Sequence, residues 1–293
     1  MFIKRSLTHE SGQALIQTAL AMVVIMVIMA LAIDVGSLYA ERRKMQNAAD
    51  AGALAGAMVL CRGGDAGADA LKLAKANGVQ PQDVVITFPD SNIISVVVST
   101  TAHSIFARIL SPSFATTPVR ARATAKCGPI STARVFPITT KYENYQSGQV
   151  VELTNRSAPG NLGWLNWEVG DTGGIGTPYL IEELLGNIPS PVISVGKDVY
   201  GEAGAKQGIQ NTMDYLCMMG TIVIIPLYDP DVAVSGQGIN SGYRVRGFAA
   251  FKLLSYDNSM GGSLRGQFVN MTSASTSTEG GTDFGVYGSR FTQ

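Results

Sequence analysis

The feature that most constrains this chain is an apolar run from Gln13 to Ile33 that contains no charged side chain. Its centre, AMVVIMVIMALAI, presents Ala, Val, Ile, Met or Leu on every face of a helix. At about 1.5 Å per residue, a helix of this length matches the roughly 30 Å hydrocarbon core of a bilayer. In lipid a single segment satisfies its backbone hydrogen bonds only as a helix. We therefore predict one transmembrane helix. The alternative is a cleaved secretory signal, whose apolar region is typically shorter and ends at a small-residue cleavage site.

The helix is expected to continue beyond the membrane to about Leu60. No proline interrupts this part, and Ala, Leu, Arg, Lys and Met favour helix. Small side chains recur at spacings of three, four and one, and so share one broad face: Ala48, Ala49, Gly52, Ala53, Gly56 and Ala57. Such a face allows another backbone to approach closely. It packs either on the protein's own domain or on a partner helix.

A set of N-terminal motifs accompanies this helix. They are Ser11-Gly12-Gln13-Ala14-Leu15 before the apolar run, Ala32-Ile33-Asp34-Val35-Gly36 at its end, then Tyr39, Arg42-Arg43 and the segment from Gln46 to Ala57. Together they resemble the N-terminus of the TadE/TadG-like Flp pilus-assembly family of bacteria. The resemblance covers about the first sixty residues; beyond them it is looser, with a similar GFAAF segment at 247–251. It implies a membrane-anchored, pilin-like component of the tight-adherence (Flp) pilus machinery without enzymatic activity. Its partners would be the lipid bilayer, other pilus-assembly proteins or pilin-like subunits, with self-association as a further option.

The chain departs from this family at the processing site. Processed pilin-like members have a Gly followed at the fifth position by Glu, and a prepilin peptidase cuts after the Gly. Here Gly12 is followed by Gln17 at that position, and cleavage would make Gln13 the first residue. Gln lacks the carboxylate that a pilin Glu offers to a neighbouring amine. Gln17 either hydrogen-bonds to a partner helix or is a tolerated polar residue near the membrane edge.

The topology follows from the residues that flank the span. Residues 1–12 form a short leader with Lys4 and Arg5, which favours a cytoplasmic N-terminal side. Arg42, Arg43 and Lys44 favour a cytoplasmic location for the opposite side of the span. Long domains, however, translocate largely regardless of charge. We therefore expect the body to lie outside the cytoplasm, in the periplasm or at the cell surface.

Length and composition limit the domain number and the classes of partner that the chain can have. The chain has 293 residues, enough for one large or two ordinary domains. The formal net charge is zero and charged residues make up 15%, so no basic excess indicates a nucleic-acid partner. No cofactor is indicated. We predict an α+β fold: a long pilin-like transmembrane helix (13–60), a small α/β unit and a β-rich C-terminal domain.

The small α/β domain is expected at 61–127. Its elements are a helix at Ala66–Ala76, strands at Asp83–Phe88 and Ile93–Ser99, a short helix at Thr101–Leu110 and a strand at Val119–Lys126. The last strand alternates strictly, with Val119, Ala121, Ala123 and Ala125 on one face and basic or polar residues on the other. This small-residue strand face is the best internal partner for the small-residue helix face.

The β-rich domain is expected at 128–272, followed by a loose Ser/Thr/Gly-rich tail at 273–293. Its strands are predicted at 135–142, 149–154, 192–195, 221–227, 243–256 and 264–269, and its helices at 179–185 and 205–219. Pro226 indicates that its strand lies at an edge or ends there.

Three patterns could carry chemistry, and none is convincing. The GDTGG sequence at 170–174 is similar to a serine-protease motif, but the nucleophile would be Thr172, and the only histidines are His9 and His103. Asp229, Asp231 and Asn240 could offer oxygen ligands to Ca²⁺, without EF-hand spacing. The three cysteines show no zinc spacing and allow three disulfide pairings. We prefer Cys61 with Cys127, because both border the small domain.

These observations favour a non-enzymatic, single-pass membrane protein that acts as a structural or assembly component of a Tad/Flp-type pilus or a related surface apparatus. The alternative is a membrane-tethered extracytoplasmic adhesin or ligand-binding module. An extracytoplasmic enzyme is a third hypothesis, which the lack of an acid/base or metal constellation disfavours.

Overall fold

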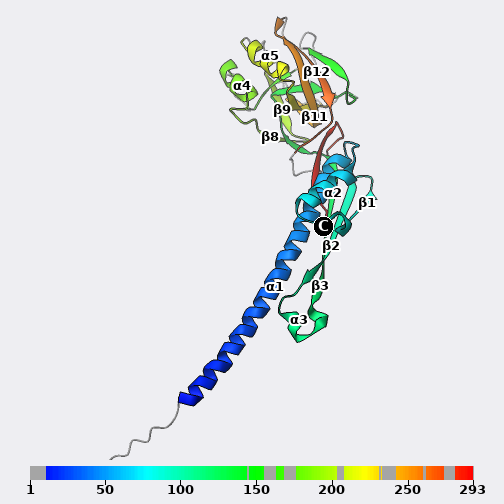
Figure 1. Cartoon of the computed structure of the whole chain (residues 1–293). Helices are drawn as coiled ribbons and strands as arrows, with labels where there is room; N and C mark the ends of the chain where they lie inside the picture. The colour runs from blue at the N-terminus through cyan, green and yellow to red at the C-terminus, as the bar shows by residue number, and fades with distance from the viewer. Residues whose placement is uncertain are drawn as a thin grey trace, which may run out of the picture. The chain divides into compact units, whose positions relative to one another are not determined.

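A computed structural model describes residues 11–143, 145–154, 163–167, 176–202, 208–230, 232, 242–259, 262–273 and 281–292. The fold is α+β, with a long N-terminal helix followed by a β-rich body that carries shorter helices, as predicted (Figure 1). The chain forms two compact units. The first comprises residues 1–53, 70–87 and 95–123, and the second comprises residues 54–69, 88–94 and 124–293. The predicted domain limits at 61–127 and 128–272 stay a prediction.

Helix α1 runs without a break from Ser11 to Leu60, a length of 50 residues. Its first half is apolar on all sides, and its second half has one buried face. Met45, Ala48, Ala49 and Ala53 are at most 2% exposed. The long helix inferred from the absence of proline and the helix-favouring composition is thus present.

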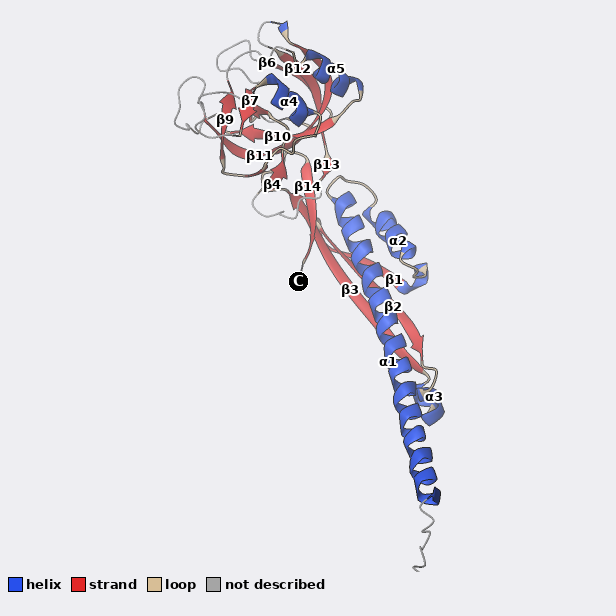
Figure 2. Cartoon of the chain, turned by 90° about the vertical axis from the view of Figure 1, so that its left-hand side faces the viewer, coloured by secondary structure: helices blue, strands red, loops and turns tan. Residues whose placement is uncertain are grey.

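The first unit packs the second half of α1 against a helix and a sheet. Its elements are α2 (Ala66–Ala76), the 3-10 turn η1 (Pro81–Asp83), β1 (Val84–Asp90), β2 (Ile93–His103), α3 (Ala107–Leu110), the 3-10 turn η2 (Pro112–Phe114) and β3 (Thr116–Pro129), some of which continue into the second unit. Figure 2 shows α2 and the strands beside α1. The interior of this unit is built from small or β-branched side chains on α1, α2, β2 and β3: Ala49, Ala53, Ala70, Ala74, Val96, Val98, Val119 and Ala121.

Strand β3 has the alternation that the sequence predicts. Val119, Ala121, Ala123 and Ala125 are buried, while Arg120 and Arg122 are exposed. The Arg122 Nε donates a hydrogen bond to the Ser95 hydroxyl at 3.0 Å. One face of this strand therefore belongs to the core and the other is polar.

The helix predicted for Thr101–Leu110 is wrong in its first half. Strand β2 continues to His103, and the helical part is only α3, Ala107–Leu110. Thr100 and Thr101 are β-branched and favour an extended chain. The backbone N–H of Ser104 then donates to the Ala115 carbonyl at 3.0 Å, which joins the two ends of the loop.

Among the described residues, the second unit contains the remaining strands and the helices α4 and α5. They are β4 (Thr132–Arg134), β5 (Ile138–Lys141), β6 (Val150–Thr154), β7 (Gly163–Asn166), α4 (Thr177–Leu184), β8 (Val192–Ser194), β9 (Asp198–Glu202), α5 (Gln210–Met218), β10 (Ile222–Tyr228), β11 (Gly242–Asp257), β12 (Ser263–Val269), β13 (Met271–Thr272) and β14 (Val286–Phe291). The main sheet has the order β10-β5-β7-β9-β11-β12-β6, and β10 also pairs with β11. The strands β10, β5, β7, β9 and β11 therefore close into a ring.

The core of this ring is aliphatic and aromatic. Ile138, Ile225, Phe251 and Leu253 are fully buried, and helices α4 and α5 add Leu180, Leu184, Met213 and Leu216 to the same cluster. The helices thus cover an apolar sheet face, as layer architectures require.

Three predictions for this unit need correction. The strand predicted at 135–142 is interrupted at Pro137, and only β5 (Ile138–Lys141) lies within it, because proline has no N–H for a strand ladder. Pro226 does not end its strand: β10 continues to Tyr228, and Pro226 itself pairs in register with Phe248. Helix α5 begins at Gln210, because Gly208 has a φ of 93°; residues 205–207 lie outside the described part of the chain.

The prediction of a loose tail is wrong for residues 286–291. These residues form β14, which pairs antiparallel with residues 125–129 of β3, with Ser289 opposite Cys127. They extend a sheet of order β1-β2-β3-β14-β13. The predicted tail also includes residues 274–280, which lie outside the described residues.

Candidate functional site

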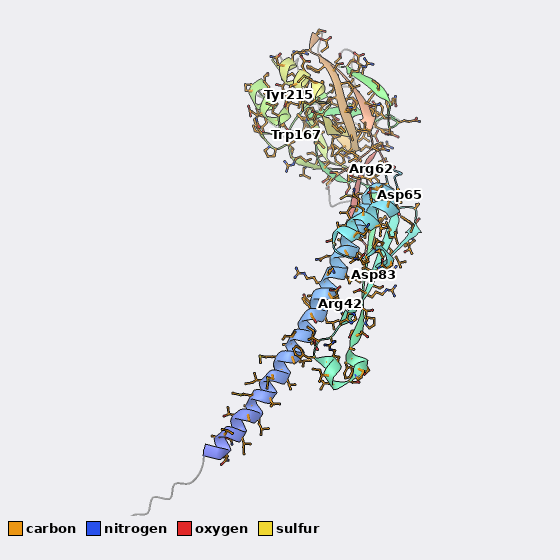
Figure 3. All side chains as sticks on the ribbon, in the orientation of Figure 1. Arg42, Arg62, Asp65, Asp83, Trp167 and Tyr215 are labelled. Carbon is orange, nitrogen blue, oxygen red and sulfur yellow. A yellow bond between two sulfur atoms is a disulfide. The ribbon has the colours of Figure 1, made fainter. Side chains whose placement is uncertain are left out.

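The span of α1 exposes apolar side chains on every side. From Gln13 to Ile33 each residue is exposed except Ala30, which is half-buried, and no charge occurs. The Thr18 hydroxyl donates to the Ala14 carbonyl at 2.8 Å, so its hydrogen bond is made within the helix. Figure 3 shows the side chains of this part projecting away from α1. The helix is long and apolar enough to cross a membrane, and such a surface is stabilised where apolar groups, such as lipid acyl chains, cover it.

Asp34, the first charged residue after the span, has a defined structural role. Its carboxylate is 8% exposed and accepts hydrogen bonds from three consecutive backbone N–H groups of the loop before α3. The donors are Ile105 at 2.8 Å, Phe106 at 3.0 Å and Ala107 at 2.6 Å. Charge-assisted bonds of this kind are stronger than neutral ones. Asp34 therefore holds the loop between β2 and β3 against α1.

An apolar groove lies between this loop and the span. Its volume is about 430 Å³, and α1 contributes Val23, Met26, Val27, Ala30 and Leu31 to its wall. These positions recur at helical spacing, so they share one face. The opposite wall comes from Phe106, Ala107, Ile109 and Leu110. No sequence pattern predicted a contact between Asp34 and this loop. A carboxylate directly after an apolar span, and the later IFARIL sequence at 105–110, were the available signals.

The small-residue face of α1 is buried against close neighbours. Ala48, Ala49, Ala53 and Ala57 are 0% exposed, and Gly52 and Gly56 are buried. A Cβ added at Gly52 would lie 3.0 Å from the Ala70 carbonyl oxygen and 3.4 Å from the Val96 Cγ1. The neighbours of Gly52 are therefore α2 and β2. The predicted contact between the rest of this face and the small-residue face of β3 stays a prediction. A side chain at this position would force α2 to shift by a few tenths of an ångström.

The predicted processing residues lie at the start of α1. Gly12, Gln13 and Gln17 are all helical and exposed, and a Cβ added at Gly12 would meet no atom within 4 Å. The structure places them on one helical turn and a half, as any contiguous helix would. Whether a peptidase cuts here stays a prediction.

Cys61 and Cys127 form a disulfide in the structure, with their Cα atoms 6.0 Å apart. It links the residue that follows α1 to β3, and this is the pairing that the sequence analysis preferred. The third cysteine, Cys217 of α5, is free and half-buried. Burial, together with the nearby Asp214 carboxylate, raises the pKa of the Cys217 thiol to about 11. Its thiolate is therefore scarce at neutral pH, and the thiol is a poor nucleophile.

The weak chemical patterns do not assemble into a site among the described residues. Within that part of the chain no group of three His, Cys, Asp or Glu side chains is placed to hold a metal ion. Asp229 accepts a hydrogen bond from the Arg246 guanidinium at 2.8 Å, so its charge is paired. His103 lies at the exposed end of β2. His9, Thr172, Asp231 and Asn240 lie outside the described residues.

These features define a class: a membrane-anchored protein in which an apolar span continues into a long helix that packs its small-residue face on an α/β unit. Residues 12–59 match the model of the TadE/G-like Flp pilus-assembly family, called Tad. The match covers the span and the small-residue face, so the similarity lies in the long N-terminal helix. No curated protein and no solved structure matches the chain.

Proposed function

We propose that this protein is a pilin-like structural or assembly component of a Tad/Flp-type pilus or a related surface apparatus, without enzymatic activity. The observation that carries the proposal is the coincidence of three properties in one helix. The charge-free span, the Asp34 contact and the close-packed small-residue face all lie within the residues that match the pilus-assembly family. A membrane span that continues into a helix packed within its own unit suits a subunit that contacts neighbours rather than converts a substrate.

The proposal includes location and partners. The span anchors the chain in the cytoplasmic membrane, and the body lies outside the cytoplasm, because long domains translocate largely regardless of flanking charge. The bilayer and other pilus-assembly proteins or pilin-like subunits are the partners. A second copy of the chain is a further one.

Deleting the gene is expected to abolish surface pili, and complementation tests anchoring and topology together. A full-length chain with a reporter fused after Gln293 should restore pili, and the reporter should be active only outside the cytoplasm. A chain whose span carries two adjacent lysines, Ile25→Lys and Met26→Lys, should not restore them, because each lysine costs about 3 kcal/mol in the middle of a span. Normal piliation of the deletion strain would contradict the proposed function, and cytoplasmic reporter activity would contradict the proposed topology.

The N-terminus is expected to escape efficient cleavage. Gln17 stands where processed pilin-like proteins have Glu, so we propose that cleavage after Gly12 is inefficient or absent. Mass spectrometry of the protein from the native membrane should detect peptides that cross the Gly12–Gln13 bond. A Gln17→Glu variant is the matched test, because it restores the family residue without changing side-chain size. Complete conversion of the natural protein to a chain that begins at Gln13 would refute this prediction.

A further inference from the structure

The loop that joins β2 to β3, residues 104–115, carries an unusual set of exposed apolar side chains. We refer to it as the tip loop. Ile109 and Leu110 are 77% and 83% exposed, and Ile105, Phe106 and Phe114 are also exposed. Scattered exposed apolar residues are ordinary, but a contiguous cluster indicates a surface that water does not cover.

The length of the span sets the depth of this loop. Gln13 to Ile33 would form a helix of about 31 Å, close to the roughly 30 Å hydrocarbon core, so the span has no residues to spare. The tip loop lies beside Val23 to Asp34 of the same helix. From Asp34 to Val23 the helix rises by about 16 Å. If the whole run spans the bilayer, the apolar end of the loop lies at hydrocarbon depth, about halfway into the membrane.

Most backbone N–H groups of the tip loop have the hydrogen-bond partners that such a position requires. In hydrocarbon, irregular structure is tolerated only where its polar groups have partners. Asp34 accepts from the N–H groups of Ile105, Phe106 and Ala107. Carbonyl or hydroxyl oxygens of the loop itself accept from Ser104, Ile109, Ser111, Ser113, Phe114 and Ala115. The hydroxyls of Ser111 and Ser113 are 2.8 Å apart and hydrogen-bond to each other.

We propose that the tip loop is a second membrane-embedded element, inserted beside the span in the half of the bilayer next to Asp34, with lipid acyl chains in the groove. The groove walls are continuous with the lipid-facing surface of α1, and they are apolar on both sides. Arg108, the one charged residue of the loop, is exposed, and its long side chain can reach the headgroups. Two contacts with the bilayer fix the rotation of the span about its own axis, which a lone helix leaves free.

Depth-dependent fluorescence quenching of the full-length protein in phosphatidylcholine vesicles tests this proposal. The background variant is Cys217→Ser, which removes the free thiol, and a single cysteine at Leu110 carries an environment-sensitive fluorophore. The matched control is Gln82→Cys, an exposed position in η1 of the same unit, next to the Asp83 labelled in Figure 3. We expect the label at 110 to be quenched by lipids with a spin label on the acyl chain and to be shielded from aqueous iodide. The label at 82 should show the reverse.

Two outcomes would overturn the proposal. Quenching of the label at 110 by iodide would place the tip loop in water. Shielding from both quenchers would show that protein, such as a second copy of this chain, covers the loop instead of lipid. Leu110 is a surface position, so neither label should disturb folding. An Asp34→Ala variant removes the acceptor for three N–H groups, and we expect it to weaken lipid quenching at 110. Unchanged quenching would contradict the role of Asp34 in holding the inserted loop.

Discussion

Removing the Cys61–Cys127 disulfide is expected to lower the free energy of unfolding of the body by about 4 kcal/mol. The bridge connects residues 66 positions apart, and a closed loop of that size loses much conformational freedom in the unfolded chain. For a body of this size, the corresponding fall in the melting temperature is roughly 10 °C. Thermal unfolding of the detergent-solubilised protein, followed by circular dichroism, measures the effect for the Cys61→Ser, Cys127→Ser double variant.

The matched control for this experiment is Cys217→Ser, which removes a thiol of the same kind without breaking a bond. It should melt close to the unaltered protein. Reducing agent should lower the melting temperature of the unaltered protein and of this control, and it should leave the double variant unchanged. Equal melting temperatures with and without reductant would mean that the bridge does not stabilise the body.

Placing a leucine at Gly52 is expected to cost about 1–3 kcal/mol, because it forces a large side chain into close packing. Even a Cβ would lie 3.0 Å from the Ala70 carbonyl oxygen, so α2 must move before the rest of the side chain fits. The two atoms nearest to such a Cβ, the Ala70 carbonyl oxygen and the Val96 Cγ1, belong to the first unit. The thermal unfolding transition of the first unit should therefore shift to lower temperature. The same variant should also impair complementation of pili if the unit is needed for assembly.

Gly36→Leu is the matched control, since it makes the same substitution in the same helix where a Cβ meets nothing within 4 Å. Helix propensity favours leucine over glycine by somewhat less than about 1 kcal/mol, so this control should be neutral or slightly stabilising. Lys44→Gln, which changes charge on the exposed side, should leave stability unchanged. If Gly52→Leu and Gly36→Leu behave alike, the small-residue face is not close-packed.

The helical anchor and its small-residue face could be predicted because both are local patterns. The absence of charge from Gln13 to Ile33 and the spacing of Ala49, Gly52 and Ala53 are readable along one helix. The alternation of β3 is similarly local. Which element packs on Gly52 was not readable, because α2 and β3 both offer small side chains, and only the folded chain distinguishes them.

The remaining errors come from contacts between residues distant in sequence. Asp34 meets the tip loop 71 residues later, and no local pattern relates the two. Residues 286–291 have a Gly- and Ser-containing sequence that suggests a loose tail, yet they gain strand structure from pairing with β3. Val286, Tyr287 and Phe291 favour a strand, and the edge of β3 supplies its partner.

Because α1 is continuous, a change in the tilt of the span also changes the position of the distal half of the helix. From Asp34 to Ala53 the helix extends about 28 Å beyond the end of the span, and no proline or break interrupts it. A change of about 10° in the tilt of the span, well within the range that bilayers allow, would displace Ala53 by about 5 Å. Bilayer thickness or a neighbouring subunit that alters this tilt would thereby move the docking surface for α2 and β2 as one rigid piece.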